Sequence, residues 1–354
     1  MYRRTACALA AALVGAVAIP AAALAKSKAV FVGPPPSIVK IAPPLLPKNF
    51  TPTYNPDVNA FFRTKTTVHV GDTVSFKFRG FHTVDLPGSA GTPLPTIVPG
   101  STVATGNDAA GNPFWFSGHI PAVGFNPALM GRSKATSYNG SARLESGLGQ
   151  SKPFNIKFTK TGSFKFYCDV HPGMVGTIVV KPKSATIPTA KQDTAATNAQ
   201  VTADVKAAKA LLKTKLPADT VSLGEAGSGG VELFAMFPAT LTVNAGTTVT
   251  FQMSKKSFET HTATFGPKSY LAPLAKSFTG AISPTAAFPS DPPVQPITLT
   301  PTSHGNGFAN TGALDTDAAS KQVPSSSQID FTTPGTYRFV CLIHPFMVGT
   351  VVVK

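Results

Sequence analysis

Two segments of the chain are near copies of each other and decide its fold. Phe154 to Lys181 reads FNIKFTKTGSFKFYCDVHPGMVGTIVVK, and Ser327 to Lys354 reads SQIDFTTPGTYRFVCLIHPFMVGTVVVK. They align without a gap, and Cys168 in the first matches Cys341 in the second. An internal repeat of this kind indicates two copies of one structural unit.

A second pair of matching segments lies upstream in the same order. Val68 to Gly88 reads VHVGDTVSFKFRGFHTVDLPG, and Leu241 to Pro267 reads LTVNAGTTVTFQMSKKSFETHTATFGP. In both, apolar residues alternate with polar ones around a turn, which is typical of half-buried antiparallel strands. Thr177–Val180 and Thr350–Val353 read as closing strands. We therefore expect an all-β chain with two β-sandwiches in tandem.

Composition agrees with this class. The 354 residues suit two domains, and 30 Gly, 33 Pro and only 13% charged residues favour strands and loops over helices. Three cysteines are too few for a disulfide scaffold. The net charge is +15, but the basic residues form no long run, so we predict no nucleic-acid binding.

The N-terminus reads as an export signal. Arg3 and Arg4 precede a small-residue apolar stretch, and Ala23-Leu24-Ala25 predicts cleavage after Ala25. The stretch is too short for a good membrane span, so the mature chain should have no transmembrane span. It would keep 31 − 2 = 29 basic and 16 acidic residues, or +13. We expect a periplasmic, cell-envelope or extracellular protein.

These patterns predict five parts of the chain. They are a signal peptide (1–25), a Pro-rich N-terminal arm without chemistry (26–55), a first domain (56–183), a linker (184–223) and a second domain (224–354). Within the linker, Val201, Val205, Ala208 and Leu212 recur at helical spacing, which predicts a short amphipathic helix. A solvated flexible tether is the alternative. Roughly 89–150 and 268–326 are long Gly/Pro/Ser-rich loop insertions.

Each repeat carries the same set of soft and imidazole donors. Cys-x-x-His-x-x-Met occurs near the end of each, and an upstream His followed by Thr accompanies it. Two His, one Cys and one Met form the donor set of a blue-copper electron-transfer site. The candidate metal ligands are His82, Cys168, His171 and Met174 in the first domain, and His261, Cys341, His344 and Met347 in the second. Two copper ions per chain are expected.

Both halves resemble cupredoxins, and the ligand loop is similar to the short loop of amicyanin-type proteins. The resemblance implies a Greek-key sandwich with one type 1 copper per domain. It also implies electron entry through His171 and His344, with Pro172, Gly173, Pro345 and Phe346 as an apolar docking rim. Cupredoxins commonly have Asn after the upstream His. Thr83 and Thr262 stand there in this chain, which leaves the bracing of the ligand loop open.

The function expected from these features is electron transfer between redox proteins of the envelope. The positive charge favours acidic partners or peripheral association with an anionic envelope surface. A copper storage or delivery protein remains an alternative, because the same ligands would serve it. A multicopper oxidase or nitrite reductase-like enzyme is the third reading.

The enzyme reading has little support from the sequence. The chain has no His-x-His pair, and only His69, His119 and His304 lie outside the two ligand sets. We expect no enzyme, and we expect these three histidines and Trp115 to have structural or surface roles.

Overall fold

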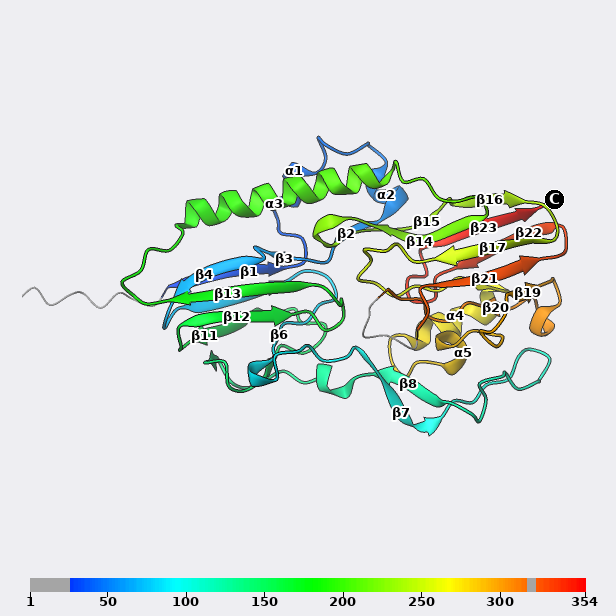
Figure 1. Ribbon diagram of the computed structural model, residues 1–354, viewed down its shortest axis with the longest axis horizontal. Coiled ribbons are helices and arrows are strands. Elements are labelled where there is room, and N and C mark those ends of the chain that lie inside the picture. The colour runs from blue at the N-terminus through cyan, green and yellow to red at the C-terminus, as the bar shows by residue number, and fades with distance from the viewer. Residues whose placement is uncertain (1–25, 317–322) are drawn as a thin grey trace, which may run out of the picture.

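The computed structural model describes residues 26–316 and 323–354. The predicted signal peptide lies outside these residues. Two β-sandwiches lie side by side along the long axis of the molecule, and one end of each faces the other (Figure 1). No helix of the described part is both long enough and apolar enough to cross a membrane.

The first sandwich contains two five-stranded sheets. The sheet with order β3-β1-β5-β11-β9 contains Phe61–Phe62, Ser27–Val32, Thr73–Phe78, Phe154–Phe158 and Ser137–Tyr138. The sheet with order β10-β6-β12-β13-β4 contains Leu144–Glu145, Asp85–Leu86, Gly162–Tyr167, Val175–Lys181 and Lys65–His69. Alternate residues face the shared core, where the rings of Phe76 and Phe166 lie 5.1 Å apart.

The second sandwich repeats this plan. Its six-stranded sheet, β19-β21-β17-β14-β15-β2, contains Ile297–Leu299, Ser326–Phe331, Thr247–Gln252, Thr220–Ala226, Val231–Phe237 and Pro56–Val58. Its five-stranded sheet, β16-β23-β22-β18-β20, contains Thr240–Val243, Val348–Val353, Gly335–Val340, Thr264–Phe265 and Ala309–Asn310. Phe251 and Phe339 meet in its core, 5.3 Å apart. The prediction of two tandem sandwiches is confirmed.

The N-terminal segment joins both sandwiches, whereas an extended Pro-rich arm without chemistry was expected over 26–55. Strand β1 pairs in parallel with β5 through alternating buried residues, including Val30 and Val32. Strand β2 crosses over and pairs with β15 of the second sandwich. Its short neighbours α1 (Ile38–Ile41) and α2 (Phe50–Tyr54) pack in an apolar cluster between the domains. The apolar residues among the prolines explain this, because they gain burial there.

The predicted linker helix is confirmed and is longer than expected. Helix α3, Ala190–Leu211, runs along both sandwiches (Figure 1). It begins with a capping box in which Thr189 and Gln192 exchange side-chain and backbone hydrogen bonds. Val201, Val205 and Ala208 are buried, as their spacing predicted. Near its start Asp193 forms ion pairs with Lys28 at 2.8 Å and Arg63 at 3.4 Å, which ties the helix to the first sandwich.

The two loop insertions pack against each other. The first contains the hairpin β7–β8, Ile97–Val103 and Pro121–Phe125. The second contains α4 (Lys268–Ser277) and α5 (Pro284–Ala287). One buried apolar cluster unites Phe114 and Phe116 of the first insertion with Leu271 and Phe308 of the second. Together with α3, this packing holds the two sandwiches in a defined relative position.

Candidate metal centres

A tight turn after strand β12 places the first set of donors. Cys168 follows the strand, and the Cys168 N–H donates to the Met174 carbonyl at 3.0 Å. The Met174 N–H donates to the His171 carbonyl at 2.9 Å, which closes the turn. Gly173 adopts a φ of +102°, a conformation that glycine tolerates best. The short spacing therefore brings Cys168 and His171 to one end of the sandwich.

His82, in the segment between β5 and β6, completes the cluster. Its Nδ1 atom lies 3.0 Å from Nδ1 of His171 and 3.8 Å from Sγ of Cys168. The Cys168 Sγ and His171 Nδ1 atoms are 3.3 Å apart. All three side chains are buried. Two buried imidazole nitrogens and one buried thiol that converge in this way are the donors a copper or zinc ion prefers.

The second domain repeats this arrangement. Nδ1 of His261 lies 3.1 Å from Nδ1 of His344, and Sγ of Cys341 lies 3.6 Å and 3.7 Å from these two atoms. The Cys341 N–H donates to the Met347 carbonyl at 3.1 Å, as in the first domain. The predicted His and Cys residues are thus brought together twice, in separate domains.

Both candidate methionine ligands are buried in the same apolar clusters as their cysteines. Met174 is 2% exposed and Met347 is 1% exposed. A buried thioether beside a His₂Cys set fits copper better than zinc, since zinc sites rarely use Met. The two cysteines are free rather than joined in a disulfide.

Threonine braces each ligand loop where cupredoxins commonly have asparagine. The Thr83 N–H donates to Sγ of Cys168 at 3.4 Å, and its Oγ1 accepts from the Asp169 N–H at 2.8 Å. Thr262 makes the same pair of contacts with Cys341 and the Leu342 N–H, at 3.4 Å and 2.9 Å. A hydroxyl can therefore hold the loop against the segment that precedes β6 or β18.

The electrostatics differ between the two clusters. Burial alone would raise the pKa of the Cys168 thiol, but the charge and hydrogen bond of His171 outweigh it and hold this pKa well below its usual value. At Cys341, burial dominates and raises the pKa to about 11. Burial and the charge of His344 lower the pKa of His261 to about 3. In the first cluster the thiolate form, which binds metals, is therefore favoured before any ion arrives.

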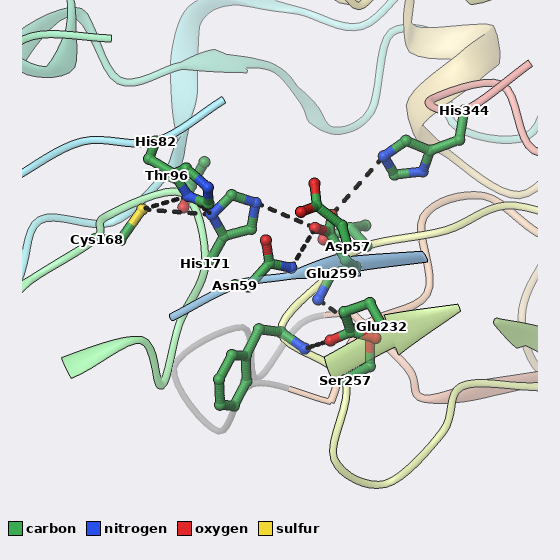
Figure 2. Close-up of polar contacts among 12 residues, drawn as sticks. Asp57, Asn59, His82, Thr96, Cys168, His171, Glu232, Ser257, Glu259 and His344 are labelled. Atoms are coloured by element: carbon green, nitrogen blue, oxygen red, sulfur yellow. Dashed lines mark hydrogen bonds and ion pairs between the residues drawn. The ribbon is translucent and has the colours of Figure 1, made fainter. Parts of the chain in front are cut away.

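Glu259 connects the two clusters across the domain interface. Its Oε1 accepts from Nε2 of His171 at 3.1 Å and from the Asn59 amide at 2.7 Å. Its Oε2 lies 3.8 Å from Nε2 of His344. Figure 2 shows the carboxylate between the two imidazoles. Burial would raise the pKa of Glu259, but the charge of His171 dominates and lowers it.

The sequence did not predict that Glu259 and Asn59 lie beside the candidate metal sites. Glu259 lies two residues before His261, and nothing in the local pattern points it toward the other domain. Asn59 follows β2, which belongs to the crossing N-terminal segment. Only the relative position of the two sandwiches gives these residues their partners.

The first cluster is covered, although His171 was expected to be exposed. His171 is 6% exposed, and the Phe258 ring lies so close to Gly173 that a Cβ there would come within 2.5 Å of it. In the second domain Phe346 stays 56% exposed. Loop 257–259 of the second domain therefore covers the expected apolar rim of the first domain. The expected rim of the second domain, around Pro345 and Phe346, is more open.

The remaining histidines have other partners. Nε2 of His69 lies 2.7 Å from the Ala185 carbonyl, and His304 lies between Asp108 and Asp291. His119 is exposed. Within the described residues, none of the three belongs to a cluster of potential metal ligands. Trp115 is an anchor, as predicted, because its Nε1 donates to the Pro289 carbonyl at 2.8 Å.

Comparison with known proteins finds likeness only among solved structures. No protein-family model and no curated protein matches the chain. A plastocyanin from Dryopteris crassirhizoma is 23% identical, over 38% of this chain and 99% of that one, with a TM-score of 0.22. A purple cupredoxin from Nitrosopumilus maritimus is 18% identical, over 39% and 100%, with a TM-score of 0.21. A mutant amicyanin in the Cu(I) form is 17% identical, over 41% and 89%, with a TM-score of 0.22.

Proposed function

We propose that each domain binds one copper ion as a type 1 centre and that the chain transfers electrons between redox proteins of the cell envelope. The observation that carries this is the duplicated convergence of two Nδ1 atoms and one Sγ atom, each time with a buried Met in the same loop. His82, Cys168, His171 and Met174 would hold one ion, and His261, Cys341, His344 and Met347 the other. Copper supplies one-electron chemistry by alternating between Cu(I) and Cu(II).

The residues around each cluster favour a site that changes little during this exchange. The Thr83 and Thr262 hydroxyls hold the backbone after each cysteine. The apolar cores around Cys168 and Cys341 exclude water from the thiolates. A rigid, dry site lowers the reorganisation that electron transfer requires.

Glu259 supports internal exchange between the two sites. When Nδ1 of His171 and of His344 faces an ion, Nε2 carries the proton. Nε2 of His171 then donates to the Glu259 carboxylate at 3.1 Å, and Nε2 of His344 lies 3.8 Å from it. The path between the two sites then consists of the His171 imidazole, the Glu259 carboxylate and the His344 imidazole. We place the outer entry point at the second domain, beside exposed Phe346, because the first cluster is covered.

His171 and His344 both line one cleft between the domains. It has a volume of about 1880 Å³ and is lined by both His171 and His344, with Glu259 between them. Small transient interfaces suit the mouth of such a cleft. With a net charge of +13 after removal of the signal peptide, we expect acidic partners.

The test is copper titration of the mature protein with visible and EPR spectroscopy. We expect two coppers per chain, both with strong thiolate charge-transfer absorption. Cys168→Ser and Cys341→Ser should each remove one blue centre and keep the other, whereas the exposed-residue control His119→Ala should keep both. A protein that stays colourless with Cu²⁺ would refute the proposal. A third copper without thiolate absorption would favour an enzyme instead.

A further inference from the structure

A second kind of polar cluster lies in the first domain, on strands β6 and β10 and at the residue that follows Cys168. Asp85, Glu145 and Asp169 are 0%, 6% and 2% exposed, and one oxygen of each lies within 4.8 Å of the others. Asp85 of β6 and Glu145 of β10 are direct cross-strand partners. Like charges placed opposite each other destabilise a sheet unless something compensates them.

Each carboxylate has one satisfied oxygen and one orphaned oxygen. Arg143 contacts Oδ2 of Asp85, the Leu94 N–H donates to Oδ1 of Asp169 at 2.9 Å, and the Gly147 N–H donates to Oε1 of Glu145 at 3.1 Å. The other three oxygens, Asp85 Oδ1, Glu145 Oε2 and Asp169 Oδ2, are buried and have no hydrogen-bond partner within the described chain. A buried polar atom without a partner is costly, and three together call for a ligand.

The second domain shows what the same place looks like without charge. Thr264 and Asn310 occupy the cross-strand positions, and Leu342 follows Cys341 where Asp169 follows Cys168. The Thr264 hydroxyl donates to the Asn310 amide oxygen at 2.8 Å. The Asn310 amide nitrogen donates to the carbonyls of Thr285 and Ala286 in α5 and of Phe288 directly after it, each at 3.1 Å. The fold therefore needs no carboxylates at this position.

We propose that Asp85, Glu145 and Asp169 bind a hard divalent cation, Ca²⁺, through their three orphaned oxygens. Three carboxylates and one Arg143 guanidinium carry 3 − 1 = 2 negative charges, which one divalent cation neutralises. Carboxylate oxygens are the ligands that Ca²⁺ prefers, and its flexible coordination suits an irregular site. Mg²⁺ demands near-ideal octahedral geometry, which three carboxylates on two strands and a loop do not supply.

The ion would join three segments that otherwise repel one another. It would link strand β6, strand β10 and the start of the ligand loop through Asp169. In its absence, burial and the charge of Asp169 raise the pKa of Glu145 to about 10 and that of Asp85 to about 7, so protons must take its place. The cation therefore stabilises the loop that carries Cys168 independently of copper.

The test uses copper-free, chelator-treated mature protein, so its result does not depend on the proposed electron transfer. Calorimetric titration with CaCl₂ should give one ion per chain, and saturating Ca²⁺ should raise Tm by about 5 °C. Glu145→Gln should weaken the affinity at least tenfold. Asp330→Asn, a carboxylate-to-amide change on the surface of the second domain, should leave the affinity unchanged.

Two results would overturn the proposal. One is a wild-type protein whose Tm is the same with excess Ca²⁺ and with chelator, which would mean that shared protons satisfy the cluster. The other is an equal Tm increase with MgCl₂, which would refute the assignment to Ca²⁺. Both measurements use the wild-type chain, so they stand even if a variant fails to fold.

Discussion

Nε2 of His171 in the first sandwich donates to Oε1 of Glu259 in the second sandwich, at 3.1 Å. The other oxygen of the same carboxylate faces His344 at 3.8 Å. One side chain therefore contacts the outer edge of both candidate metal sites. Because imidazole, carboxylate and imidazole follow one another, a change of charge at either site should be felt at the other.

Removing the charge of Glu259 should raise the reduction potentials of both centres. The carboxylate stabilises the more positive oxidised state, and at this distance its loss should amount to on the order of 50 mV at each site. We expect Glu259→Gln to show this in a spectroelectrochemical titration. It should also slow redistribution of an electron between the sites after pulse reduction, because the amide keeps an acceptor for only one histidine.

Asp291→Asn is the matched control for this prediction. Asp291 lines the same cleft but pairs with His304, away from both clusters. Its variant should leave both potentials within about 10 mV of the wild-type values, since a screened charge at longer range contributes little. Equal shifts in the two variants would argue against a specific bridge through Glu259.

The covering ring of Phe258 should protect the first centre from external reductants. We expect Phe258→Ala, in a Cys341→Ser background with a single blue centre, to increase the second-order rate of reduction by ascorbate several-fold. Stopped-flow absorbance measures this rate. Phe346→Ala serves as the control, since Phe346 lies at the second domain's loop. An unchanged rate in the Phe258 variant would mean that the ring does not limit access.

The hydroxyl of Thr83 should be worth about 1 kcal/mol of unfolding free energy, the usual contribution of one hydrogen bond. Thr83→Ala removes the acceptor of the Asp169 N–H, whereas Thr83→Ser keeps it. Urea unfolding of the copper-free protein should therefore show a loss in the first variant and little change in the second. If both variants lose the same stability, the methyl group rather than the hydroxyl is responsible.

Asp204 should make the chain less stable as pH rises from about 4 to 7. It lies on α3, is 4% exposed, and its burial raises the pKa to about 7. In this interval Asp204 holds a proton in the folded chain that it has released in the unfolded chain, so its contribution to the free energy of unfolding falls with pH and levels off above about 7. Asp204→Asn should remove this contribution to the slope and stabilise the protein at pH 8 by about 2–4 kcal/mol.

Asp193→Asn provides the opposite control on the same helix. Asp193 pairs with Lys28 and Arg63, so its variant should lose stability at pH 8. Urea unfolding at pH 5 and pH 8 distinguishes the two changes. A destabilised Asp204→Asn at pH 8 would mean that the carboxylate has a partner that offsets its burial.

The sequence alone determined the local chemistry. The Cys-x-x-His-x-x-Met spacing places Cys168 and His171 on one tight turn, and the alternating apolar residues predict the strands that carry them. The seven-residue turn and the alternation of apolar residues along a strand are both short-range properties, because each is set by residues close together in the sequence. The repeat extended the same inference to Cys341 and His344.

Only the tertiary structure decided how the two halves meet. The crossing of β2 into the second sandwich, the cover of Phe258 over Gly173, and the position of Glu259 between two histidines all depend on contacts between residues far apart in sequence. The grouping of Asp85, Glu145 and Asp169 depends likewise on strand register. Such contacts leave no periodic pattern in the sequence, because a single carboxylate carries no sign of the partner that packing will bring to it.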